Sequence, residues 1–74
     1  MRMVAIVRDP DICMGLKLAG VECYNAETVE ALPEILEAIS PADTGIIAIS
    51  DEFIELELIQ TFLKANPQML YLAM

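Results

Sequence analysis

The sequence predicts a single small α/β domain over residues 1–74, with a four-stranded parallel sheet between helices. Apolar, strand-like runs alternate with helix-like runs along the whole chain, which is typical of consecutive βαβ units. The chain has 74 residues, so it is at most one domain. Because such crossovers are right-handed, the strands should be parallel, and we expect the flavodoxin- or receiver-like order 2-1-3-4 of a three-layer βαβαβαβ fold.

The first strand and helix are predicted from the start of the chain. Residues 1–7 (MRMVAIV) are mostly apolar, as in a strand buried on both faces. Asp9, Pro10 and Asp11 then favour a helix start, since Asp caps helices and Pro suits the first helical position. Gly20 is expected to end this helix. One face of this helix is expected to carry Ile12, Cys13, Leu16 and Ala19.

A second strand and helix are expected in the next third of the chain. Residues 21–24 predict a short strand, and Asn25 is expected to cap a helix that runs to about Ile39. Pro33 has no N–H to donate to the carbonyl four residues earlier, so we expect a kink or a late start there. Residues 40–44 are typical of a turn.

Residues 45–50 (GIIAIS) predict the strongest strand, which should be central. Ser50 or Asp51 is expected to cap a third helix, which should end at Asn66 and Pro67. Apolar residues recur in it at helical spacing: Phe53, Ile54, Leu58, Ile59, Phe62 and Leu63. A fourth strand follows at residues 69–74 (MLYLAM). It should form an apolar edge of the sheet, which is a hazard unless something covers it.

The charge and hydropathy of the chain exclude some classes of partner. Twelve acidic residues against four basic ones give a net charge of −8. This balance excludes nucleic-acid binding and polybasic attachment to lipid, both of which need basic side chains. The acidic surface suits solubility or a basic protein partner. Hydrophobic residues make up 57% of the chain, and so small a domain should leave some of them at a surface that marks an interface.

The sequence also indicates the cellular compartment. No run of about 20 apolar residues is present to span a membrane. Residues 1–7 are too short for the apolar core of a signal peptide, so we expect a cytoplasmic protein. Cys13 and Cys23 fit this compartment without a disulfide. The absence of histidine removes the commonest general base and metal ligand, and we expect no cofactor.

Two acidic residues lie where open α/β sheets bind ligands, beyond the carboxyl ends of the strands. Asp9 follows the first strand and Asp51 the third, so together they could hold a magnesium ion. The simpler interpretation is that both begin helices. A phospho-receiver domain would need an acidic pair after strand 1 and a lysine after a fifth strand, and both are missing here. Neither glycine-rich phosphate-loop pattern occurs.

Cys13 is a candidate nucleophile, because a thiolate is stabilised in the first turn of a helix. That role would require a phosphate-binding loop and an arginine six residues later, where this chain has Ala19. A small buried apolar residue is the simpler interpretation. We therefore predict no catalytic residue.

One stretch resembles a known family. Residues 4–7 (VAIV), Asp9 and residues 15–21 (GLKLAGV) resemble the opening of the F subunit of archaeal and bacterial A-type/V-type rotary ATPases. That family typically has a strand ending in Gly-Asp, followed by a helix bearing Gly-Phe-Arg/Lys-Leu-Ala-Gly-Val. Residues 45–50 and 51–54 are similar to its third strand and following helix. The resemblance covers nearly all of the chain in order.

The chain departs from the family pattern at several places. Arg8 replaces the usual glycine, Leu16 replaces the usual aromatic residue, and the fourth strand lacks a closing proline. Family members also carry a C-terminal extension that reaches along the central stalk. This chain corresponds to the N-terminal domain without that extension.

The resemblance implies a non-catalytic central-stalk subunit of a proton- or sodium-translocating ATPase. Such a subunit binds the coiled-coil D subunit, adjoins the catalytic head subunits, and helps couple rotation to ATP hydrolysis or synthesis. It is peripheral to the membrane. The motif residues Asp9, Gly15, Leu16, Lys17 and Gly20 are the candidates for partner contact. Gly15 is also expected to allow close packing of the helix on the sheet.

Two alternatives remain open from the residues themselves. The first is a stand-alone receiver-like regulatory domain that binds a small anion or metal near Asp9 and Asp51. The second is a self-associating domain that pairs its fourth strand across a two-fold axis. Neither alternative needs the family resemblance.

Overall fold

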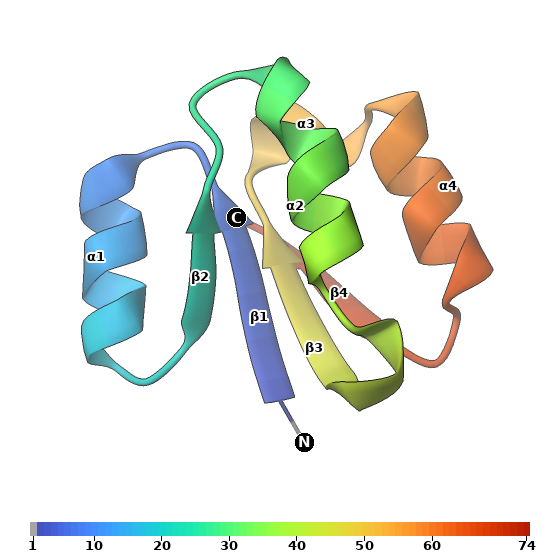
Figure 1. The fold of residues 1–74 in the computed structure, drawn as a ribbon, viewed down its shortest axis with the longest axis horizontal. Helices are drawn as coiled ribbons and strands as arrows, with labels where there is room; N and C mark the ends of the chain where they lie inside the picture. Colours follow the sequence, from blue (N-terminus) through green and yellow to red (C-terminus); the bar gives the residue numbers. More distant parts are fainter. Residues whose placement is uncertain (1) are drawn as a thin grey trace.

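A four-stranded parallel sheet forms the centre of the molecule (Figure 1). The structure is a computed structural model that describes residues 2–74. Its strands are β1 (Arg2–Val7), β2 (Glu22–Asn25), β3 (Thr44–Ile49) and β4 (Leu70–Ala73), in the order β2-β1-β3-β4. All neighbouring strands are parallel. The predicted fold class and strand order are therefore confirmed, with β4 at one edge.

Helices lie on both sides of this sheet. The helix α1 (Pro10–Leu18) connects β1 to β2, and α2 (Leu32–Ala38) precedes β3. Two helices, α3 (Asp51–Ile54) and α4 (Glu57–Ala65), connect β3 to β4. Figure 1 shows α2 and α4 in front of the sheet, with α1 beside β2. Short 3-10 helices at Val29–Ala31 and Pro41–Asp43 complete the connections.

The larger core lies between the sheet and α2, α3 and α4. Alternate residues of the two central strands point to this side, because successive side chains of a strand face opposite ways. Ile6 of β1 and Ile47 of β3 are fully buried here, and α3 and α4 contribute Phe53 and Ile59. Burying each such side chain stabilises the fold by about 1.5–3 kcal/mol.

The smaller core lies on the α1 side. It is made of five buried residues, Ala5, Val7, Cys13, Cys23 and Ala48, with Leu16 and Val21 packed against them. Most of these side chains are small, so α1 lies close to β1 and β2. On this side α1 lies over β1 and β2, and Leu70 and Leu72 of β4 are exposed.

The ends of α1 follow the sequence prediction. The Asp9 carboxylate accepts a hydrogen bond from the Asp11 N–H at 2.8 Å, which satisfies one of the free donors of the first turn. At the other end Gly20 has φ +91°, and Val21 N–H donates to the Leu16 carbonyl at 2.9 Å. This is the Schellman arrangement that glycine favours. One part was wrong, because Ile12 and Ala19 of the predicted apolar face lie outside the core.

Asn25 does not cap the second helix as expected. It ends β2, and its side-chain amide donates to the carbonyls of Val7 and Arg8 at 3.1 and 2.9 Å. These bonds join the ends of β1 and β2, so the Asn25 side chain is not available to cap a helix. The late helix start is confirmed, since α2 begins at Leu32 with Pro33 in its first turn.

The third helix is two helices rather than one, which corrects the sequence prediction. The chain leaves α3 at Glu55, and the extended Leu56 precedes α4. In a continuous helix the apolar residues of this stretch would spread around the whole circumference, whereas the break turns both segments toward the core. Gln60 compensates, because its side-chain amide donates to the Ile54 carbonyl that the break leaves free.

Ser50 occupies the cap position before α3, but its hydroxyl is used elsewhere. The Arg8 N–H donates to the Ser50 Oγ at 3.0 Å, which connects the carboxyl ends of β1 and β3. The expectation that Ser50 or Asp51 caps this helix is confirmed for Ser50, which is the N-cap residue but makes no capping bond with its side chain. The Phe53 N–H instead bonds to the Ser50 carbonyl.

Candidate partner interface

The uncovered side of β3 and β4 carries apolar side chains. The register pairs Ile46 with Leu70 and Ala48 with Leu72. Because Ala48 belongs to the core on the α1 side, Leu70 and Leu72 point to that side as well. They are 68% and 52% exposed. Strand alternation adds Met3 and Met74, and we call the five residues Met3, Ile46, Leu70, Leu72 and Met74 the open apolar face.

The exposed surface of α1 carries large apolar side chains beside the charged Asp11 and Lys17. Ile12, Met14 and Leu18 are exposed there, Leu18 by 83%. A surface helix ordinarily turns polar residues outward, so this arrangement is unusual. We call these three residues the α1 ridge. It lies on the same side of the sheet as the open apolar face, and the two together form the candidate interface.

Gly15 lies beside the α1 ridge and corrects a sequence prediction. We expected it to allow close packing of the helix on the sheet, but a Cβ added there would meet nothing within 4 Å. A glycine inside a helix is less stable than alanine by about 0.5–1 kcal/mol. No contact within the domain requires a glycine here, so the lost helix stability is not offset inside the monomer. An exposed glycine does let another chain approach the helix backbone closely.

The other predicted contact residues have different positions on or next to α1. Asp9 caps the helix, Gly20 ends it, and Leu16 is half-buried against the smaller core. Lys17 is exposed in the last turn and makes no ion pair in the described residues. Of the five, only Gly15 and Lys17 lack a role in the fold. The sequence did not predict the α1 ridge, because apolar residues in a short helix are ordinarily expected to be buried.

Acidic residues gather on the opposite side of the sheet. The elements that cover the larger core, together with the loops beside them, carry Glu30, Glu34, Glu37, Asp51, Glu52, Glu55 and Glu57. The open apolar face has no ionisable side chain at all. The molecule therefore has an acidic side and an apolar side, and these suit different neighbours.

The carboxylates considered as metal ligands are not arranged as a metal site. The Asp9 carboxylate already accepts the capping bond, and Asp51 begins α3. Within residues 2–74 no three acidic or cysteine side chains gather closely enough to hold a metal ion, and no pocket is present.

The two cysteines are buried free thiols of the smaller core. Burial, together with a hydrogen bond to the Cys13 thiol, raises the pKa of Cys23 to about 12. The thiol form of Cys23 is therefore stable at neutral pH, and a thiolate is required for nucleophilic chemistry. For Cys13, 2% exposure fits the simpler interpretation of a small core residue.

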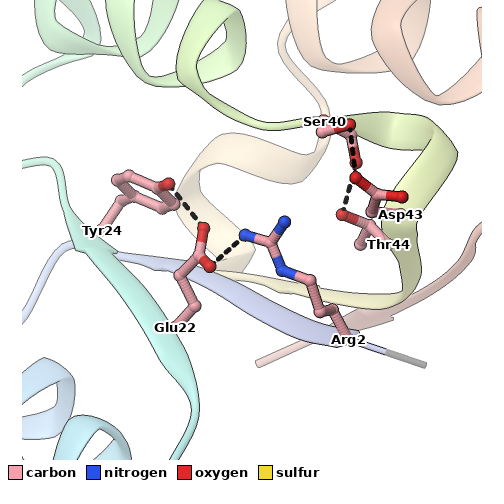
Figure 2. Close-up of polar contacts among 6 residues, drawn as sticks. All are labelled: Arg2, Glu22, Tyr24, Ser40, Asp43 and Thr44. Carbon is pink, nitrogen blue, oxygen red and sulfur yellow. Dashed lines mark hydrogen bonds and ion pairs between the residues drawn. The ribbon is translucent and has the colours of Figure 1, made fainter.

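A polar cluster at the amino end of the sheet has a structural role (Figure 2). The Arg2 guanidinium pairs with Glu22, and the Tyr24 hydroxyl donates to the same carboxylate at 2.6 Å. The bond from Tyr24 first and the contact with Arg2 second lower the pKa of Glu22, and the bond to Glu22 raises the pKa of Tyr24. Since the three groups bind one another, they join β1 to β2. Nearby, the Thr44 hydroxyl donates to the Ser40 carbonyl at 2.9 Å.

Comparison with known proteins identifies the family. Neither the curated proteins nor the solved structures gave a match to this chain. No helix within residues 2–74 is long and apolar enough to cross a membrane. The family model described as ATP synthase (F/14-kDa) subunit matches residues 4–71, which include all four helices and most of the sheet. The chain therefore belongs to the F/14-kDa subunit family of the V/A-type rotary ATPases.

Proposed function

We propose that the chain is a non-catalytic central-stalk subunit that binds the coiled-coil D subunit of its rotary ATPase. In this role it turns with D and helps couple rotation to ATP hydrolysis or synthesis, in a complex that translocates protons or sodium ions. Family membership supports a place in the ATPase complex. The candidate interface supports binding to another chain, since exposed apolar surface of this kind marks contact sites.

The observation that carries the proposal is the uncovered half of the sheet beside α1. A helix of D that lies over Leu70 and Leu72 occupies the place next to α1, and helices that pack side by side are 8–10 Å apart in general. Because Gly15 has no side chain on the exposed surface of α1, the two helices can lie at the shorter of these distances. The D helix then covers the open apolar face and the part of α1 that lies beside it.

The acidic side has a separate role in this proposal. With the apolar side against D, the carboxylates of α2, α3 and α4 point away from the stalk, where they meet water or basic segments of the catalytic head subunits. The subunit then lies in the cytoplasm, peripheral to the membrane, and reaches it only through the rest of the complex.

The test is a binding measurement between this chain and the D subunit of the same complex. Leu72→Glu puts a charge into the open apolar face, and we expect binding at least about tenfold weaker, equivalent to ~1.4 kcal/mol. Val29→Glu is the matched control, because Val29 is a 42% exposed apolar residue in the short 3-10 helix that precedes α2. Circular dichroism verifies that both variants fold. Equal affinity of L72E and the unchanged chain would remove the open apolar face from the interface.

A further inference from the structure

The outer edge of β4 has main-chain groups that no other strand within residues 2–74 uses. The Met74 N–H donates to the Ile49 carbonyl at 2.9 Å, and the Asp51 N–H donates to the Met74 carbonyl at 2.8 Å. In a parallel ladder one residue turns both main-chain groups to a neighbour and the next residue turns them away. The N–H and C=O groups of Tyr71 and Ala73 therefore point outward from the sheet.

This edge is short, but it lacks the charged side chains and prolines that usually block strand pairing. Natural edge strands carry charged side chains, prolines or bulges that prevent another chain from adding to the sheet. Residues 69–74 contain no Asp, Glu, Lys, Arg or Pro. Leu70, Tyr71 and Leu72 are all more than half exposed. The edge is thus open both in its backbone and in its side chains.

We propose that two copies of this chain pair through β4 in antiparallel orientation, about a two-fold axis at Leu72. Tyr71 then lies opposite Ala73 of the second copy, and the two residues exchange a pair of N–H···O bonds on each side of the axis. The two sheets become one continuous sheet. This inference does not rest on the proposed function, since it needs only the edge and a second copy.

The register follows from the edge itself. Centring the axis on Leu72 pairs every outward group of Tyr71 and Ala73. Centring it on Tyr71 would place Ala73 opposite Met69, whose N–H already donates to the Asn66 carbonyl. The Leu72 register also sets the large Tyr71 side chain against the small Ala73 on one side of the sheet. On the other side it groups the leucines of both copies.

The paired strands carry no charge, although each copy has a net charge of −8 and the copies repel at long range. No charged side chain of β4 faces its copy, so the strands themselves do not repel. The helix α4 runs from the carboxyl end of β3 toward the amino end of β4. The two-fold axis therefore sets the α4 helices antiparallel, with Lys64 of one copy toward the end that carries Glu57 in the other. These are opposite charges, which favours the pairing.

The size of the edge determines the strength of the dimer. A pairing of two four-residue strands is small beside the ~1,200–2,000 Å² that stable interfaces bury. We therefore expect a weak dimer that is absent at ~10 µM and prominent at ~1 mM, with rapid exchange.

The experiment is analytical ultracentrifugation of the whole chain across this concentration range. The expected result is an apparent mass that rises toward twice the monomer mass. Ala73→Pro removes an outward N–H while leaving the bonds to β3, as an edge strand tolerates. It should remain monomeric. A chain that stays monomeric at ~1 mM, or an A73P variant that dimerises like the unchanged chain, would overturn the proposal, the latter because it would indicate contact between open apolar faces.

Amide hydrogen exchange supplies a second readout that does not depend on a variant. Between ~10 µM and ~1 mM the exchange of the Tyr71 and Ala73 amides should slow several-fold. The Leu72 amide, which already faces β3, should not change. This alternation distinguishes edge pairing from any other contact. Equal slowing at all three positions, or slowing at none, would contradict edge pairing even if A73P failed to fold.

Discussion

At the residue scale, the fold requires one of the two glycines of the family motif and does not require the other. Gly20 has φ +91°, a conformation that residues with a Cβ adopt only with strain, and it ends α1. Gly15 lies in an open part of the same helix, where nothing is near its missing Cβ. The first is required by the domain. The second is tolerated by the domain, and we assign it to the proposed contact with the D subunit.

Alanine at each position separates these roles. Gly15→Ala should stabilise the isolated chain by about 0.5–1 kcal/mol, because alanine favours the helix more than glycine does. Gly20→Ala should destabilise it by about 1 kcal/mol or more, since the positive φ is then strained. Urea unfolding of both variants measures the difference. A loss of stability in G15A would show that the domain itself uses this glycine.

At the scale of elements, the contact between β1 and β2 depends on ionisation. Glu22 accepts bonds from Tyr24 and Arg2, and its pKa in the folded state is lowered below the ordinary value of 4.5. A lowered pKa contributes stability that is present above the unfolded value and is lost as the pH falls through the folded value. The contribution is modest, because the groups are exposed to water.

Glu22→Gln tests this contact. The variant should be slightly less stable than the unchanged chain at pH 7, and the difference should shrink as the pH falls below 4.5. Thermal unfolding at pH 7, 5 and 3 is the measurement, with Glu34→Gln on the exposed surface of α2 as a control. A constant difference at all three pH values would mean that the carboxylate does not stabilise the strand pair.

Element positions were predicted well where the signals are local. The alternation of apolar runs gave the four strands and their order, and Asp9 and Gly20 marked the ends of α1. The break at Glu55 and Leu56 was not predicted, because it depends on how two helical segments fit one core. Asn25 was misassigned for the same reason, since its partners are carbonyls at the end of a different strand.

At the scale of the whole molecule, the two sides of the sheet are unequal. The side covered by α2, α3 and α4 holds the larger core and the acidic residues, while the other side is half covered by α1. The apolar edge strand predicted part of this asymmetry, because it indicated surface in need of cover. The exposed apolar side chains of α1 were not predicted, since sequence periodicity placed Ile12 on one face with Cys13 and Leu16.

Two substitutions, one on β3 and one on β4, should show how much each side of the sheet contributes to the stability of the chain. Ile47→Ala in the larger core should destabilise the chain by about 2–5 kcal/mol, because Ile47 is fully buried. Leu72→Thr on the open apolar face should change the stability of dilute chain by less than about 0.5 kcal/mol. Chemical denaturation at low concentration measures both. A large loss in L72T would mean that the open apolar face stabilises the monomer.

The half-covered sheet should also affect how long an unassembled copy of the subunit survives in the cell. Chaperones and proteases act on exposed apolar segments and unpaired strand edges, and β4 presents both in an unassembled copy. Once the stalk has formed, D hides the leucines of that strand in the proposed assembly. In that assembly we expect an unincorporated copy to be degraded sooner than a copy within the complex.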